Sequence, residues 1–356
     1  MACTPAVARA DGAASLAPPA GAPAPEELVV HVGPPRALER SICGGFAVRH
    51  SRTCGAELHG HWPPALALGA DTRVLARLGR DPRLLELDPA RALYLDIETT
   101  GLHGGAGTWP FLVALGSFEQ GPTGPVFVVW QGFLSSPSEE RAMLRDIAER
   151  VRASSGLVTF FGKSFDRHRL EDKMRLHGIP APFADAPHLD LYHPLRRLYG
   201  KALPDGRLAT LERELVALGR IGDLPGSQAP AAWFDFLAGR PHHLEEVFEH
   251  NRVDVVSLAV LLAHLACTLD EIGPEGAALS GPPIARARAL AELFEKERAH
   301  DDALHWCAAA LARLEALPEF QRAAAAPFVQ ELVERRARIE TRRARAARAP
   351  KHTRRP

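Results

Sequence analysis

The sequence predicts an α/β fold: a mixed five-stranded sheet flanked by helices, followed by an all-α helical-hairpin module. Three observations predict this fold. Three apolar, strand-like stretches follow one another over residues 91–133 with short connections. Strand-like and helical segments then alternate as far as residue 272. After a loop rich in Gly and Pro at 273–283, the pattern is helical throughout.

The first three strands are expected to form an antiparallel meander. RALYLDIE, FLVALGSF (111–118) and PVFVVWQGF (125–133) are joined by short turns such as EQGPTG, and short connections favour antiparallel pairing. The segment SPSEERAMLRDIAERVRA has helical periodicity and begins with Ser and acidic residues, as helices often do. GLVTFF (156–161) and HLDLY are two further strands, and a long helix at 244–269 closes the domain.

The chain divides into five predicted regions. Residues 1–27, rich in Ala, Pro and Gly, are expected to be disordered. Residues 28–90 form an N-terminal appendage with short strands and one short helix, and residues 91–272 form the main domain. Residues 284–334 begin with two amphipathic helices spaced like a tetratricopeptide hairpin, a module suited to a protein partner. The tail, residues 335–356, has ten Lys and Arg against one acid, and attracts polyanions.

Composition narrows the class of protein. Apolar residues make up 46% of the 356 residues, and the formal net charge is zero. No apolar run reaches the roughly 18–20 residues of a membrane span, and the N-terminus lacks the pattern of a secretion signal. The five cysteines are scattered, which argues against a disulfide framework. These features predict a cytoplasmic protein that does not associate with membranes.

Four acidic residues stand out because of their settings. Asp96 and Glu98 lie two residues apart on an apolar strand, so both side chains point to the same face. Asp166 lies at the start of a helix, directly after GLVTFF. Asp254 lies on the last helix of the domain, and His250 is four residues earlier, on the same helical face.

Four converging carboxylates require a positive counter-charge, which two divalent cations supply. Oxygen-rich sites suit Mg²⁺ or Mn²⁺, and two such ions can clamp the attacking and leaving oxygens of a phosphodiester. We expect Asp96 to bridge both ions, Glu98 and Asp254 to complete one site, and Asp166 to complete the other. His250 would then accept a proton from the attacking water; the alternative for His250 is an ordinary interhelical contact.

The motifs DIETTGL, GKSFD and HNRVDVVSL, in this order, resemble the three motifs of the DEDD superfamily of 3′–5′ exonucleases. ETTGLHGGAGT, PGSQAPAAWFDFL and the tetratricopeptide-like tail are similar to the bacterial YprB-type ribonuclease H-like proteins. The resemblance covers about residues 90–270 well and 280–316 loosely. It implies a ribonuclease H-like fold, two divalent cations, and Asp96, Glu98, Asp166, His250 and Asp254 as the catalytic set.

Two residues depart from the usual motifs. His250 stands at the spacing that is usual for tyrosine, and Phe161 stands where many relatives have asparagine. RLATLERELVAL is similar to a segment that braces the site in many relatives, so Asp190, Thr210 and Glu212 are expected to have supporting roles.

Substrate contacts are expected around the same motifs. Lys163 and Arg167 flank Asp166 and are candidates for phosphate contacts, although such charges often only face solvent. Thr99 and Gly101, at the end of the first strand, are further substrate-binding candidates. Trp109 and Phe161 are candidates for stacking on a terminal base, with core packing as the alternative.

These features together predict a metal-dependent 3′–5′ exonuclease that acts on single-stranded 3′ ends of DNA or RNA. Two alternatives remain open at this point. One is a non-catalytic nucleic-acid-binding or adaptor protein with the same fold, whose helical module recruits a partner. The other is an endonuclease that acts on structured substrates such as the RNA strand of a hybrid.

Overall fold

The computed structural model describes residues 32–41, 45–101, 107–220 and 222–348. Residues 1–27, which are expected to be disordered, lie outside these ranges. So do the end of the basic tail and most of the glycine-rich stretch after Gly101. No helix in the described ranges is long and apolar enough to cross a membrane.

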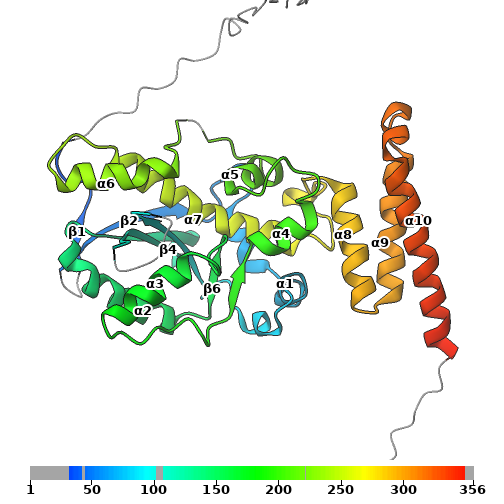
Figure 1. Cartoon of the computed structure of the whole chain (residues 1–356), viewed down its shortest axis with the longest axis horizontal. Coiled ribbons are helices and arrows are strands. Elements are labelled where there is room, and N and C mark those ends of the chain that lie inside the picture. Colours follow the sequence, from blue (N-terminus) through cyan, green and yellow to red (C-terminus); the bar gives the residue numbers. More distant parts are fainter. Residues whose placement is uncertain (1–31, 42–44, 102–106, 221, 349–356) are drawn as a thin grey trace, which may run out of the picture.

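A seven-stranded sheet forms the centre of the described chain (Figure 1). Its order is β1-β2-β5-β4-β3-β6-β7. The pairs β3–β6 and β6–β7 are parallel, and all other neighbouring strands pair antiparallel. The strands are β1 (Glu39–Arg40), β2 (Ala47–Cys54), β3 (Leu93–Thr99), β4 (Pro110–Gly121), β5 (Gly124–Phe133), β6 (Leu157–Thr159) and β7 (His188–Asp190). The meander β3-β4-β5 and the mixed sheet are confirmed.

The expectation of five strands is wrong in number, because the segment before residue 91 adds two strands. Strand β2 pairs antiparallel with β5 along its whole length, from Ala47 opposite Phe133 to Cys54 opposite Val126. The free edge of β5 offers unpaired backbone groups, which a further strand satisfies. From the same segment, Trp62 and Leu75 are buried in the core.

The helices cover both faces of the sheet (Figure 1). They are α1 (Thr72–Gly79), α2 (Glu140–Ala153), α3 (Asp166–Leu176), α4 (Tyr192–Tyr199), α5 (Leu208–Leu211), α6 (Ala229–Leu237), α7 (Leu244–Ala266), α8 (Pro283–Lys296), α9 (His300–Glu315) and α10 (Glu319–Arg348). A single π-helical turn, Glu212–Val216, follows α5. Helices α2 and α3 pack on the face that carries Leu95 and Ile97, whereas α7 packs on the face that carries Tyr94.

The last three helices continue the core away from the sheet. Phe294 of α8, Cys307 of α9 and Ile339 of α10 belong to the same buried cluster as Tyr94 and the second half of α7. Arg77 of α1 pairs with Glu297 at 3.2 Å, which adds a polar contact between α1 and the end of α8. The two amphipathic helices expected after residue 283 are thus confirmed, whereas a tetratricopeptide-like identity and the domain boundaries stay predictions.

Candidate active site

Strand β3 directs two acids toward helix α7. Leu93, Leu95 and Ile97 are buried on the α2 and α3 side of the sheet. Asp96 and Glu98 alternate with them and therefore point to the opposite face, where α7 lies. In the β3–β4 ladder Asp96 is opposite Ala114 and Glu98 is opposite Leu112, both apolar residues. The two carboxylates therefore have no charged partner on the neighbouring strand.

Helix α7 approaches this face closely because β4 has a glycine beneath it. A Cβ atom at Gly116 would lie 2.5 Å from Cγ1 of Val255 and 2.4 Å from Cζ of Phe127. Any side chain larger than hydrogen would push the helix away at this point. The short distance brings Asp254, the neighbour of Val255, toward the acids of β3.

The charges of the four predicted acids act on one another. Burial raises the pKa of Asp96 well above its usual value, and the charges of Asp254, Asp166 and Glu98 raise it further. Burial, followed by the charges of Asp254 and Asp166, likewise raises the pKa of Glu98. Burial and then the charges of Asp190 and Asp254 raise the pKa of Asp166. The structure thus brings together acids from β3, α3 and α7, as the motif order predicts.

Two amide side chains hold Asp96 in place. Asn251 of α7, fully buried, donates from Nδ2 to Oδ2 of Asp96 at 2.7 Å. Gln131 of β5 donates in turn from Nε2 to Oδ1 of Asn251 at 3.0 Å and to the carbonyl of Phe248 at 2.8 Å. Sequence reasoning missed both residues, although Asn251 precedes Asp254 by three positions and so lies on a neighbouring part of the same helix face.

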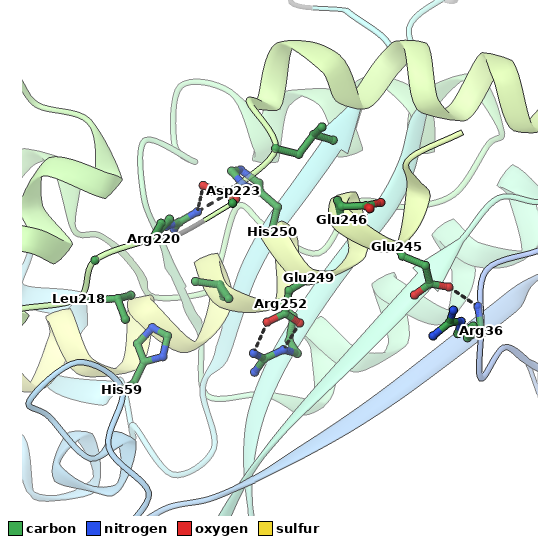
Figure 2. Close-up of a pocket in the computed structure, with 14 residues that line it drawn as sticks. Arg36, His59, Leu218, Arg220, Asp223, Glu245, Glu246, Glu249, His250 and Arg252 are labelled. Carbon is green, nitrogen blue, oxygen red and sulfur yellow. Dashed lines mark hydrogen bonds and ion pairs between the residues drawn. The ribbon is translucent and has the colours of Figure 1, made fainter. Parts of the chain in front are cut away.

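His250 lies between an acid that orients it and two acids of the site. Its Nδ1 is 2.6 Å from Oδ1 of Asp223, while its Nε2 is 3.7 Å from Oδ2 of Asp254 and 4.0 Å from Oε1 of Glu98. Burial alone would lower the pKa of His250, but the hydrogen bond to Asp223 and the charge of Asp254 raise it. Figure 2 shows His250 beside Asp223. The bond to Asp223 holds the imidazole with Nε2 toward Asp254 and Glu98.

Arg220 is a third residue that sequence reasoning missed. Its guanidinium forms two hydrogen bonds to the buried Glu212, at 2.6 and 2.7 Å, and one to Asp223 at 3.1 Å. It also forms an ion pair with Asp254. Desolvation would lower the pKa of Arg220, but the bonds to Glu212 and the charge of Asp254 keep it above its usual value, so the side chain stays charged. Arg220 thus supplies the counter-charge for Asp254.

The residues expected to have supporting roles brace the loops around the acids. Asp190 accepts hydrogen bonds from the backbone amides of Phe161 at 2.8 Å and Lys163 at 3.0 Å, and thereby fixes the loop that leads to Asp166. The Thr210 side chain lowers the pKa of Asp205. Glu212, as described, holds Arg220.

The expected substrate-binding residues differ in their surroundings. The ammonium group of Lys163 lies 3.8 Å from Asp81, and Arg167 pairs with Glu171 at 2.6 Å. The hydroxyl of the buried Thr99 donates to the carbonyl of Gly101 at 3.0 Å, which closes the end of β3.

The two candidate stacking aromatics also differ. The ring of Trp109 packs under Lys173, whose ammonium lies 4.1 Å from the ring centroid, so the packing alternative fits Trp109. Lys173 itself is buried in an ion pair with Glu140 at 2.9 Å. Phe161, by contrast, is 45% exposed.

A cleft of about 660 Å³ opens beside His250 (Figure 2). Arg220, Asp223 and His250 line one end of it, and Glu245, Glu249 and Arg252 of α7 line another part. Arg252 and Glu249 neutralise each other at 2.6 Å. The cleft gives solvent and ligands access to the histidine side of the acidic site.

The donor set fits divalent cations in its chemistry. It consists of four carboxylates, of which Asp96, Glu98 and Asp166 form no ion pair with Lys or Arg in the described ranges. Hard cations such as Mg²⁺ and Mn²⁺ prefer such oxygen donors. Among the described residues, however, no three acidic, histidine or cysteine side chains are already arranged as a metal-binding group. Arg220 pairs with Asp254 and thereby occupies one of the four carboxylates.

Comparisons with known proteins agree with the fold. Residues 93–266 match the family model of the RNase_H superfamily. The matched residues begin with β3 and end with α7, so all four acids and His250 lie among them.

A curated relative matches the same part of the chain. The uncharacterized protein YprB of Bacillus subtilis (strain 168) is 35% identical over 176 residues, which are 49% of this chain and 41% of that protein. The match therefore spans about two fifths of the relative's length.

Proposed function

We propose that this protein is a metal-dependent 3′–5′ exonuclease that hydrolyses terminal phosphodiesters of DNA or RNA by a two-metal mechanism. The observation that carries the proposal is the convergence of four carboxylates from β3, α3 and α7, in which the charge of Asp254 raises the pKa of each of the other three. Buried like charges destabilise a fold unless counter-charges neutralise them, and clusters of this kind concentrate at functional sites. The RNase_H superfamily match supports nuclease chemistry, and the three-motif resemblance supports the exonuclease subtype.

Asp96, Glu98, Asp166 and Asp254 would hold two divalent cations, Mg²⁺ or Mn²⁺. When bound, such ions neutralise the acids and the negative charge that develops on the phosphodiester. Asn251 keeps Asp96 oriented toward the site through its 2.7 Å hydrogen bond.

His250 would act as the general base. Its Nε2 faces the acids and accepts a proton from the attacking water, while Asp223 holds the ring through Nδ1 and stabilises the imidazolium. The water oxygen forms a bond to phosphorus, the P–O3′ bond breaks, and a nucleoside monophosphate leaves.

The direct test is digestion of 5′-labelled single-stranded DNA and RNA with Mg²⁺ or Mn²⁺. We expect wild-type protein to shorten the strand stepwise from its 3′ end, chelation to stop the reaction, and Asp96→Asn to lower the rate by on the order of a hundredfold or more. Asp185→Asn is the matched control, because Asp185 is exposed and remote from the motifs. Equal digestion by wild type and Asp96→Asn would contradict the proposal.

One observation favours a second candidate, the non-catalytic adaptor. Arg220 already neutralises Asp254 without a metal ion, as a permanently inactive site would require. An adaptor would bind the labelled strands yet leave them intact with either cation. An endonuclease would instead release internal fragments from the first time points.

A further inference from the structure

A second polar cleft, of about 460 Å³, lies where helices α4 and α8 meet the end of α1. Figure 1 shows α4 beside α8, with α1 next to them. Four basic side chains line it: Arg80, Arg196, Arg197 and Lys201. We call this feature the basic cleft. All four residues are exposed to solvent.

The positive charge of the basic cleft is compensated only in part within the described chain, by Glu292, on which the charge of Lys201 acts. Arg80 and Lys201 form no ion pair there. Arg196 donates to the hydroxyl of Tyr192, and Arg197 donates to the carbonyl of Leu78, both neutral acceptors.

Only one acid of the described residues lines the basic cleft. It is Glu292, and Lys296 already pairs with it at 2.6 Å. Although Arg197 as a whole residue is exposed, desolvation of its guanidinium, followed by the charge of Arg80, lowers its pKa. A cluster of four like charges with a single, already paired acid is stabilised by a bound anion.

A chain of contacts links the basic cleft to the acidic site. His193, which lines the cleft at the start of α4, lies 3.8 Å from Asp190. Asp190 accepts the amide hydrogen bonds that fix the loop before Asp166, and its charge acts on Asp166 itself. Asp190 therefore interacts both with a residue of the cleft and, through its charge, with an acid of the site.

An exposed aromatic ring lies on this connection. Phe161 is 45% exposed, and its ring centroid is 4.9 Å from that of Tyr192, at the start of α4. Its backbone has φ of +62°, a left-handed conformation that is costly for a bulky residue and that concentrates at functional sites. The 2.8 Å bond from its amide to Asp190 maintains that conformation. Exposed aromatic rings beside basic grooves are the usual means of binding single strands.

We propose that the basic cleft binds backbone phosphates of a single-stranded nucleic acid whose terminal nucleotide lies at the acidic site, with Phe161 stacked on a base between them. The placement of the terminal nucleotide rests on the proposed function. The order of acids, aromatic ring and basic cleft matches a strand that presents a reacting phosphate, then a base, then further phosphates.

The test is the binding of 5′-labelled single-stranded oligonucleotides to the full chain in EDTA, measured by fluorescence anisotropy. The cleft variant is Arg80→Gln with Lys201→Gln, because neither side chain has a partner in the described ranges whose loss would disturb folding. The control is Arg141→Gln with Arg145→Gln, which removes two equally exposed charges from α2.

We expect the Kd of the cleft variant to rise on the order of tenfold and that of the control to stay the same. The slope of log affinity against log salt should flatten by about 1.4 for two lost phosphate contacts on a single strand. In a series from about 4 to about 16 nucleotides, only the longer strands should lose affinity in the cleft variant. Phe161→Ala should weaken all lengths by about fivefold or more.

Two results would overturn the proposal: a cleft variant that binds like wild type, or equal losses in the cleft variant and the control. The proposed function fails separately. If wild type binds strands through the basic cleft but does not digest them with Mg²⁺ or Mn²⁺, the proposal of exonuclease activity is wrong, whereas the proposal that the cleft binds nucleic acid is supported. If Asp96→Asn abolishes digestion while the cleft variant binds normally, only the cleft proposal fails.

Discussion

The two halves of helix α7 have opposite characters. From Val255 to Leu265 every residue is buried, and nearly all are apolar. From Leu244 to Asp254 only four residues are buried, and this half presents His250, Asn251 and Asp254 to the acidic site. We call Val255–Leu265, which packs in the core, the anchor half of α7, and Leu244–Asp254, which carries the polar groups, its polar half.

The difference shows where the stability of each half originates. The anchor half is stabilised by its own apolar burial, roughly 25 cal/mol for each Å² removed from water. The polar half depends on residues from other elements: Arg220 for Asp254, Asp223 for His250, and Gln131 for Asn251. We therefore expect the polar half to respond to substitutions outside the helix and the anchor half to substitutions within it.

Arg220→Met should have the largest effect on the polar half. It leaves the buried Glu212 and its neighbour Asp254 without a cation, and we expect the free energy of unfolding to fall by about 3–5 kcal/mol. Denaturant titration in EDTA measures this change. Arg213→Met is the control, since Arg213 pairs with Glu214 at the surface and contributes about 1 kcal/mol or less. Equal losses for the two variants would refute the dependence on Arg220.

Leu261→Ala tests the anchor half. Leu261 is fully buried, so the cavity should lower the free energy of unfolding by about 2–5 kcal/mol, again by denaturant titration. Val253→Ala, in the polar half and partly exposed, should cost about 1 kcal/mol or less. If Val253→Ala cost as much as Leu261→Ala, the division of the helix would not hold.

Asn251→Ala separates positioning from anchoring. It removes the donor to Asp96 and the acceptor of Gln131, which should lower the free energy of unfolding by about 1–3 kcal/mol. Because Asp96 is no longer oriented, the rate of strand digestion should fall more than that loss of stability explains at temperatures where the variant is folded. Unchanged digestion by folded Asn251→Ala would exclude the positioning role.

His264 makes the anchor half sensitive to acid. Burial lowers its pKa to about 3, so the folded protein keeps it neutral while the unfolded chain takes up a proton below about 6.5. Stability is therefore lost as the pH falls from about 6.5 toward 3, by up to about 1.4 kcal/mol per pH unit for this group. His264→Gln should flatten that slope, and the exposed His305→Gln should not. Identical slopes in wild type and His264→Gln would contradict the prediction.

The sequence predicts the parts of the site that follow from periodicity. The two-residue spacing of Asp96 and Glu98 and the four-residue spacing of His250 and Asp254 fix which face each side chain occupies. The meander and the long last helix follow from the same kind of pattern. Asn251 could have been found by the same reasoning, since it lies three residues before Asp254 on that helix.

Other parts depend on tertiary contacts that no local pattern contains. Strand β2 joins β5 across more than 70 residues, and its sequence AVRHSRTC is too polar at alternate positions to reveal the partner. Arg220 and Asp223 lie in an irregular loop, after a left-handed residue at Ala217 with φ of +55°. Loop geometry of this kind decides which carboxylate an arginine reaches, and spacing along the chain does not.

Binding of divalent cations to the four acids is the central claim, and thermal unfolding with increasing Mg²⁺ or Mn²⁺ tests it most directly. A cation that binds only the folded state stabilises it by about 2.7 kcal/mol at a hundred times its Kd. The account predicts a Tm that rises with cation concentration for wild type and Asp185→Asn, and no rise for Asp96→Asn. A rise of the same size in Asp96→Asn, or none in wild type, would contradict it.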